Sequence, residues 1–190
     1  MARSFSKFGI SFVFALLLSH SVDADMRSES LDAFMKLHAV AKSPRCVNCH
    51  STTDYPLQTD QSVPHIMNVT RNIEKLGMKC TSCHSATGTN ELHMPPSAPN
   101  WRMPSKEKKL FSNMAPDYLC SLWKSTATRA ENGDKIGPGR DLDQMLQHIS
   151  EDPLVNWAWH PGGNRTTPPG THEEFVANFK KWKETGAACP

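Results

Sequence analysis

Two short cysteine–histidine motifs are the residues of this sequence best suited to chemistry. In each motif two cysteines are separated by two residues and followed directly by a histidine; one motif spans Cys46 to His50 and the other Cys80 to His84. This is the attachment signal for haem c, because the thiols add across the haem vinyl groups and the next residue then lies beneath the iron. We therefore expect two covalently bound haem c groups. The expected attachment residues and proximal iron ligands are Cys46, Cys49, Cys80 and Cys83, with His50 and His84.

Zinc binding and disulfide chemistry are the alternative uses of such cysteine pairs. A zinc ribbon also contains two C-x-x-C pairs, but it gives no reason for His50 and His84 to follow both pairs. A thioredoxin-type redox site requires a strand–helix–strand context, which the sequence does not show. Haem attachment accounts for every residue of both motifs.

The sixth ligand of each iron is harder to predict, because a lone histidine or methionine usually serves packing. His65 lies in a turn-prone stretch before the second motif, His148 ends a helix with an apolar inner face, and His93 lies in a proline-restrained loop. Our distal candidates, in order of preference, are His65, His148, His93 and His172. The choice matters because methionine ligation raises the reduction potential relative to histidine. The remaining candidates are His38, His160, Met67, Met94, Met103, Met114 and Met145.

The N-terminus resembles a secretory signal peptide. Arg3 and Lys7 form a basic start, Phe8 to Leu18 is an apolar run, and small residues occupy positions 22 and 24. We predict a signal peptide over residues 1–24, cleavage after Ala24, and a soluble periplasmic protein of residues 25–190. The apolar run is far shorter than the roughly 20 residues that span a bilayer.

Export also determines how the two remaining cysteines are interpreted. Cys120 and Cys189 are outside both motifs, so in an oxidising compartment a disulfide between them is the default expectation. It would close a loop of about 70 residues and stabilise the fold by roughly 4 kcal/mol on the chain-entropy model. The alternative is a reactive thiol or a thiolate ligand to iron.

The fold class predicted from periodicity is mainly α with long irregular loops. We expect helices from Ser30 (as N-cap) to Ser43, over Pro116–Lys124, over Asp141–Ile149, and from a capping box at Thr171 to Gly186. The inward-facing residues predicted for these four helices are Leu31, Phe34, Met35 and His38; Leu119, Leu122 and Trp123; Leu142, Met145, Leu146 and Ile149; and Phe175, Phe179 and Trp182.

The spacing of the motifs predicts the architecture. Only 29 residues separate His50 from Cys80, which is too few for an independent single-haem domain to be completed before the next begins. We therefore expect a compact dihaem cytochrome c domain over residues 25–190, with two closely spaced haems that each serve as core for the other. Two separate cytochrome domains are the alternative.

Several stretches resemble a family of bacterial dihaem c-type cytochromes labelled isoquinoline 1-oxidoreductase subunits. These are SPRCVNCH, PHIMNVTRN, MKCTSCH, HMPPSAPNWRMP, QHISEDPLVNWAW, PGTHEEFVANFKKW and the tail ETGAACP. The resemblance runs from about Arg45 to Pro190 and implies electron transfer alongside a molybdenum-dependent hydroxylase. Members of that family more often carry histidine at the place of Ser43.

These observations predict a periplasmic electron-transfer protein rather than an enzyme in its own right. It would act as a carrier or as the electron-accepting subunit of a molybdenum hydroxylase or another periplasmic dehydrogenase. The alternatives are a small dihaem enzyme of the peroxidase or thiosulfate-oxidising type, or a haem-based sensor. A formal charge of +2 over 190 residues gives no indication of nucleic-acid binding.

Overall fold

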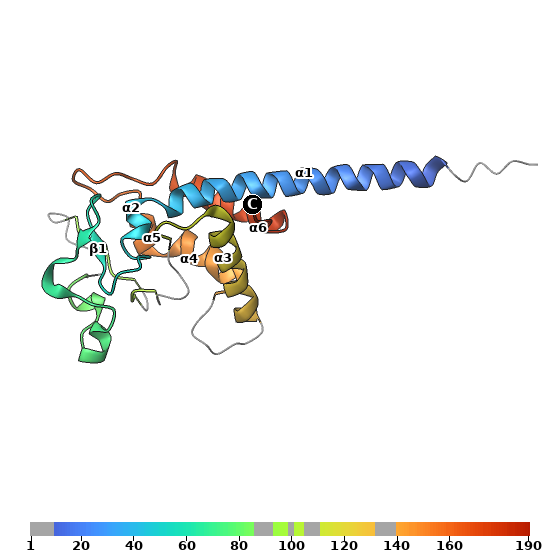
Figure 1. Ribbon diagram of the computed structural model, residues 1–190. Coiled ribbons are helices and arrows are strands. Elements are labelled where there is room, and N and C mark those ends of the chain that lie inside the picture. The colour runs from blue at the N-terminus through green and yellow to red at the C-terminus, as the bar shows by residue number, and fades with distance from the viewer. Residues whose placement is uncertain (1–9, 86–92, 99–100, 105–110, 132–139) are drawn as a thin grey trace, which may run out of the picture.

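A computed structural model describes residues 10–85, 93–98, 101–104, 111–131 and 140–190, and in this part of the chain the fold is mainly helical, as predicted. Short 3₁₀ turns and one small antiparallel hairpin lie between the longer helices (Figure 1). In chain order the elements are α1 (Ile10–Ala41), α2 (Pro44–Val47), β1 (Leu57–Gln58), β2 (Val63–Pro64), η1 (Ile66–Asn68), η2 (Ile73–Leu76), η3 (Cys80–Ser82), α3 (Pro116–Glu131), α4 (Leu142–Glu151), α5 (Pro153–Trp157) and α6 (His172–Glu184).

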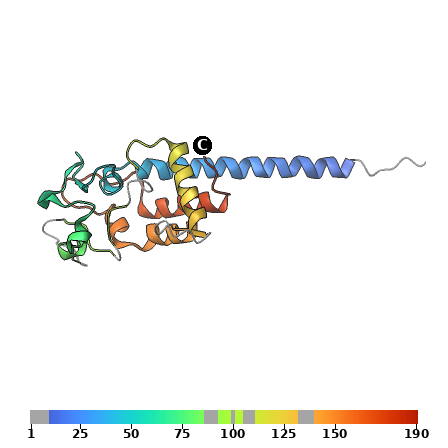
Figure 2. The same cartoon turned by 60° about the horizontal axis from the view of Figure 1, so that its bottom comes forward.

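Helices α1, α3, α4 and α6, with the tail at residues 187–189, form what we call the helical body. Helix α6 packs along the C-terminal half of α1, α4 packs against α6, and α3 crosses this pair (Figure 2). Its core contains Phe34, Leu37, Leu119, Phe179 and Trp182, all at most 1% exposed. Burial of such large apolar side chains is the main favourable term in folding, so the helical body has a core of its own.

The sequence predicts the C-terminal part of this body well. Helix α6 begins with the expected capping box, in which the Thr171 hydroxyl accepts from the Glu174 amide (3.2 Å) and the Glu174 carboxylate accepts from the Thr171 amide (2.9 Å). Phe175, Phe179 and Trp182 are buried, as predicted. The four apolar residues predicted for the inner face of α4 pack against the core.

The start and inner face of the first helix differ from the prediction. Ser30 is no N-cap, because α1 begins at Ile10 and Ser30 lies buried within it. Its hydroxyl instead donates to the Trp182 carbonyl (3.3 Å) and accepts from the Ala188 amide (2.9 Å). Met35 is 45% exposed while Leu37 is fully buried, because the face of α1 that meets α6 is rotated from the predicted one. Helix α3 also runs beyond Lys124, and the short α5 was not predicted.

The N-terminal part of α1 extends away from the helical body (Figure 2). Residues 23–29 are exposed, whereas Ser30 is fully buried. The predicted cleavage after Ala24 would therefore leave the packed face of α1 in place. No helix within the described ranges is long and apolar enough to cross a membrane.

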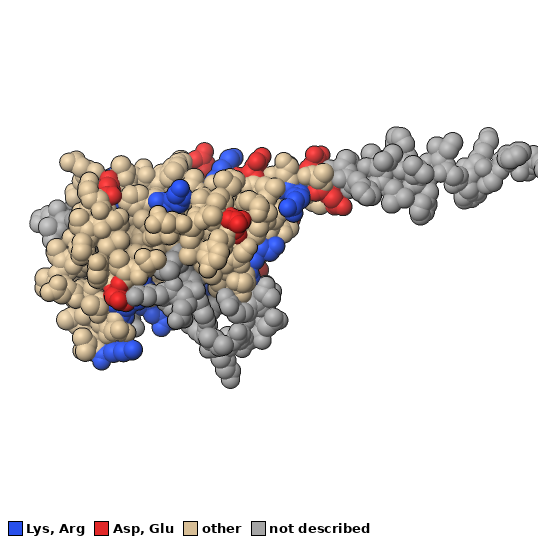
Figure 3. Space-filling view, viewed as in Figure 1, with Lys and Arg blue, Asp and Glu red and all other residues tan. Residues whose placement is uncertain are grey.

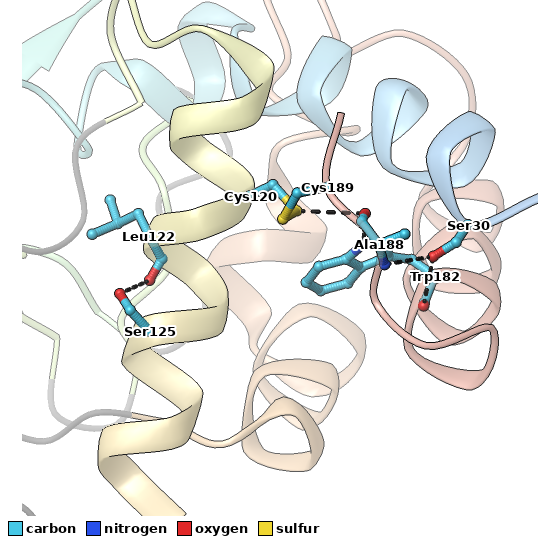
Figure 4. Close-up of a disulfide and its surroundings, with 7 residues drawn as sticks. All are labelled: Ser30, Cys120, Leu122, Ser125, Trp182, Ala188 and Cys189. Atoms are coloured by element: carbon cyan, nitrogen blue, oxygen red, sulfur yellow. Dashed lines mark hydrogen bonds between the residues drawn. A yellow bond between two sulfur atoms is a disulfide. The ribbon is translucent and has the colours of Figure 1, made fainter. Parts of the chain in front are cut away.

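A disulfide joins Cys120 of α3 to Cys189 of the tail, as predicted (Figure 4). The Trp182 indole donates to the Ala188 carbonyl (3.0 Å), next to the bridge. The tail is thus tied covalently to α3 and by hydrogen bonds to α1 and α6.

Residues 44–85, 93–98 and 101–104 form what we call the motif region. It contains the β1–β2 hairpin, in which Leu57 pairs with Pro64 and Gln58 with Val63, and the three 3₁₀ turns. Its described buried residues are Arg45, Asn48, Ser51 and Ala98. Three of these four are polar, so the described part of this region lacks an apolar core of its own.

Candidate functional site

The two motifs fold into the same tight turn. In the first, the amides of Cys49 and His50 both donate to the Cys46 carbonyl, at 3.3 and 3.0 Å. In the second, the amides of Cys83 and His84 both donate to the Cys80 carbonyl, at 3.2 and 3.0 Å. One helical turn places the two cysteines and the histidine of each motif close together, as attachment to a single planar group requires.

The first motif is built into a capped helix. Ser43 is the N-cap of α2, its hydroxyl accepting from the Arg45 amide at 3.1 Å, and Pro44 follows at the first helical position. Burial, with a smaller effect of neighbouring charges, raises the pKa of Cys46 to about 12 and that of Cys49 to about 11. Burial thus favours the protonated thiol over the thiolate at both cysteines.

His50 is held in place by an aromatic neighbour. Its ring stacks on Phe111 with centroids 3.9 Å apart and planes 5° apart, and the Phe111 amide donates to the His50 carbonyl (2.9 Å). Phe111 in turn contacts Trp123 of α3, with centroids 5.8 Å apart. The first motif is thus fixed to the core of the helical body.

The imidazole of His84 is held in a tautomer that could bind a metal ion. Its Nδ1 donates to the Pro95 carbonyl (3.0 Å), which leaves Nε2 as the basic nitrogen. Burial lowers the pKa of His84; the bond to Pro95 opposes this shift, and the charge of nearby His65 adds to it. Neutral imidazole, the form that binds metals, is therefore favoured. Trp101 packs beside the ring, with centroids 4.7 Å apart.

His65, the first distal candidate, lies close to His84. The two ring centroids are 6.1 Å apart, and the ring planes make an angle of 67°. The Nδ1 of His65 also bonds a backbone carbonyl, that of Ile66, so both rings keep Nε2 for another partner. Two imidazoles on opposite sides of one metal ion, with metal–nitrogen bonds of about 2 Å, have centroids about 6 Å apart. The separation of His65 and His84 fits an iron between them.

The turn that follows His65 is conformationally unusual. Met67 and Asn68 both have positive φ, at 72° and 50°. For residues other than glycine this is an uncommon and costly conformation that collects at functional sites. Met67 is 80% exposed, so apolar packing of its side chain does not account for the turn. The strained pair follows directly on the segment that presents His65.

Two of the other distal candidates, His148 and His172, make contacts among the C-terminal helices. The Nδ1 of His148 pairs with the carboxylate of Asp152 (3.0 Å). The Nε2 of His172 donates to the Ile149 carbonyl (2.6 Å), and its ring packs on Trp159 with centroids 5.0 Å apart. The described contacts of both histidines connect α4, α5 and α6 and do not include either motif.

His93 lies nearer the motifs, against a glycine pair. A Cβ on Gly162 would come within 2.1 Å of the His93 Nδ1, so only glycine permits this approach. The His93 carbonyl accepts from Arg165 at 3.0 Å, and the same loop supplies the Pro95 carbonyl to His84. His93 therefore joins the loop beside the second motif to the segment around Gly162.

Sequence reasoning missed a buried ion pair beside the first motif. Arg45, the residue before Cys46, donates from Nη2 to Oδ1 of Asp60 at 2.6 Å. The other carboxylate oxygen of Asp60 accepts from the amide and the hydroxyl of Thr166, both at 2.9 Å. An arginine next to a motif cysteine was a visible signal, but nothing in the sequence pairs it with Asp60 or Thr166.

A second arginine ties the segment between the two motifs to the end of the first motif. Arg71 donates from Nη2 to the carbonyls of Ser51 (2.6 Å) and Thr53 (2.9 Å), which directly follow the first motif. Besides burial, the nearby charge of Cys80 raises the pKa of Cys49. The two motifs therefore belong to one region of the molecule.

Large apolar side chains are exposed just before the second motif and within reach of a ligand there. Figure 1 shows this segment at the end of the molecule opposite the free part of α1. The exposed residues are Val63 (40%), Ile66 (66%), Met67 (80%), Leu76 (80%) and Met78 (50%). Such a patch marks a place where another apolar surface binds, as one face of a porphyrin would.

A cavity of about 330 Å³ opens beside the first motif, lined by Val47, Leu57 and Phe111 among others.

Within the described ranges, no three histidine, cysteine or acidic side chains gather so that they could hold a metal ion.

No protein-family model, no curated protein and no solved structure matches this chain. The resemblance to dihaem cytochromes remains a prediction from the motifs, and functional conclusions depend on the geometry of the motif region.

Proposed function

We propose that this chain is an exported c-type cytochrome with two haems that transfers single electrons. One haem would be attached at Cys46 and Cys49, with His50 as proximal ligand, and the other at Cys80 and Cys83. Haem supplies a one-electron couple whose potential the protein sets through axial ligands, burial and nearby charge. The observation that carries the proposal is the close pair of His65 and His84, whose ring centroids are 6.1 Å apart, with both Nδ1 atoms on backbone carbonyls.

The chain supplies the other requirements of attachment. Both motifs form the same turn, and the disulfide joins Cys120 to Cys189 and uses no motif cysteine. The described part of the motif region lacks an apolar core and exposes large apolar side chains, so a large apolar group would complete it. These features support two haems sharing one domain over residues 25–190.

For the second haem we propose His84 as proximal and His65 as distal ligand. The carbonyls of Pro95 and Ile66 hold the two rings in the tautomer that leaves Nε2 for iron. With both axial positions filled by protein, that iron offers no place for peroxide or oxygen. This arrangement favours electron transfer over catalysis.

The proposed partner is a protein that donates or accepts single electrons. The chain would act as a carrier or as the electron-accepting subunit of a periplasmic dehydrogenase, and the family resemblance indicates a molybdenum hydroxylase. Figure 3 shows charges of both signs interspersed over the face in view, and the formal net charge is +2. Strong electrostatic steering of a partner is therefore not expected.

Replacement of His65 by alanine tests the assignment. We expect His65→Ala to convert one of the two haems to a high-spin form that binds carbon monoxide when reduced. His148→Ala and His172→Ala are matched controls, because their rings are engaged within the helical body. These controls should retain the parent absorption and magnetic resonance spectra.

Two results would contradict the proposal at different levels. A His65→Ala protein whose haems both stay low-spin would place the distal ligand elsewhere. A wild-type protein without covalent haem, or with zinc in its place, would remove the proposed function itself.

A further inference from the structure

We propose that the buried guanidinium of Arg45 raises the reduction potential of the haem attached at Cys46 and Cys49. This inference rests on the proposed function, and it assigns a role in that function to a residue outside the haem motif.

Arg45 is placed so that its charge reaches the first site at full strength. It precedes Cys46 directly, and its side chain is only 2% exposed. Its Nε is buried and has no hydrogen-bond partner among the described residues. A guanidinium is always protonated in proteins, and an interaction of charges in a buried, low-dielectric setting is much stronger than in water.

The neighbouring carboxylate does not neutralise the cluster. Asp60 bonds Arg45 and also accepts two hydrogen bonds from Thr166. Arg165 lies near enough that its charge lowers the pKa of both Arg45 and Asp60, although burial is the larger cause for Arg45 and the Thr166 amide for Asp60. Arg165 bonds the carbonyls of His93 and Pro161. Its charge therefore lies near the Arg45–Asp60 pair without neutralisation by that carboxylate, and a formal positive charge remains beside the first motif.

The cation that directly precedes the second motif is not buried in the same way. Lys79 precedes Cys80 as Arg45 precedes Cys46, but Lys79 is exposed. Solvent and salt screen an exposed charge. Arg71 also has a buried nitrogen, and it bonds the carbonyls of Ser51 and Thr53, which follow the first motif. The charge of Arg45 is therefore less screened at the first site than the charge of Lys79 is at the second.

The sign of the effect follows from the charge change on reduction. Adding an electron makes the haem less positive, so a fixed cation nearby stabilises the reduced form and raises the potential. The carboxylate of Asp60 acts in the opposite direction. Removing Arg45 and removing the charge of Asp60 should therefore shift the potential with opposite signs.

The test is a spectroelectrochemical titration of the full-length holoprotein and four variants. Arg45→Gln should lower the midpoint potential of the first haem, Arg45→Lys should keep most of it, and Asp60→Asn should raise it. Lys180→Gln, an exposed site on α6, removes the same charge as Arg45→Gln and should leave both potentials unchanged. The second haem is identified as the one whose spectrum changes in His65→Ala.

Potential shifts of opposite sign in Arg45→Gln and Asp60→Asn distinguish an effect of charge from a loosening of the structure. A looser structure would let more water reach the haem and would lower the potential in both variants. If Arg45→Gln does not fold, the sign of the Asp60→Asn shift decides alone. Shifts of the same sign, or no shift, in a protein shown by pyridine haemochrome to hold two haems would overturn this inference only. Fewer than two haems in the wild type would instead overturn the proposed function.

Discussion

The helical body and the motif region are stabilised in different ways. In the helical body, Phe34, Phe179 and Trp182 are almost completely buried, and a disulfide closes the structure. In the motif region, the described buried residues are mostly polar, and segments are joined by arginines, Arg45 to Asp60 and Arg71 to backbone carbonyls. One region excludes water by itself, and the other needs an additional apolar surface.

On the proposed function, this difference predicts where haem would contribute to folding. The five exposed large apolar residues between positions 63 and 78 are on the same segment as His65, whose ring lies 6.1 Å from that of His84. A haem attached there would bury apolar area at about 25 cal/mol per Å² and would replace the missing core. The helical body should therefore depend little on haem, and the motif region should depend on it strongly.

The largest effect is expected from preventing attachment altogether. Replacing all four motif cysteines by alanine should leave the helical circular dichroism largely intact, because the core of the body lies outside both motifs. Amide hydrogen exchange should become fast over the motif region and stay slow in α1 and α6. Equal protection of the two regions without haem would contradict the comparison.

The disulfide should matter to the helical body and not to the haem sites. We expect Cys120→Ser with Cys189→Ser to lower the free energy of unfolding by roughly 4 kcal/mol, because the bridge closes a loop of about 70 residues. Denaturant titration measures the loss. The visible spectra should be unchanged, so a spectral change would show that the two regions are coupled more tightly than we propose.

A smaller effect is expected from the N-cap of the first motif. Ser43→Ala removes the acceptor of the Arg45 amide and should cost about 1 kcal/mol. Thr171→Ala is the matched control, since it removes the corresponding cap of α6 in the helical body. Only Ser43→Ala should speed hydrogen exchange around Cys46. Similar exchange there in both variants would argue that Ser43 does not stabilise the first motif locally.

The smallest expected effect is on how the stability of the fold depends on pH. The hydrogen bond from the Thr166 amide, aided by the Thr166 hydroxyl and the charges of Arg45 and Arg165, holds the pKa of Asp60 below its ordinary value against the effect of desolvation. A lowered folded pKa adds stability at neutral pH that is lost as the pH falls through that value, below about 4. Urea titrations of wild type and Asp60→Asn should therefore differ at pH 7, and the difference should shrink as the pH falls below about 4. A difference that persists in acid would have another cause.

The helical body could be predicted largely from the sequence because its signals are local. Thr171 and Glu174 form a capping box that the sequence shows directly, and the apolar periodicity of α6 identifies Phe175, Phe179 and Trp182 as core. Helix α5 was not predicted, although its start has a local N-cap signal in the sequence. Asp152 precedes Pro153 and accepts from the Leu154 amide (2.9 Å). Ser30 was misassigned because its partners, Trp182 and Ala188, lie more than 150 residues away.

The candidate site was only partly predictable. The spacing of the two motifs predicts attachment through their cysteines and ligation by their histidines, and these assignments stay predictions. A turn-prone stretch singled out His65, whose ring centroid lies 6.1 Å from that of His84. The contact of Asp60 with Thr166 and the approach of His93 to Gly162 depend on segments far apart in sequence. Long-range contacts of this kind are not marked by any periodicity or motif in the sequence.

The most direct test of the central claim is the intact mass of the exported holoprotein, measured together with its pyridine haemochrome spectrum. We predict a mass equal to the polypeptide after cleavage behind Ala24 plus two haems, with a haemochrome typical of thioether-linked haem. Peptide mapping should place one haem on residues 46–50 and the other on residues 80–84. A protein with one haem, no haem, or zinc at these cysteines would contradict the account.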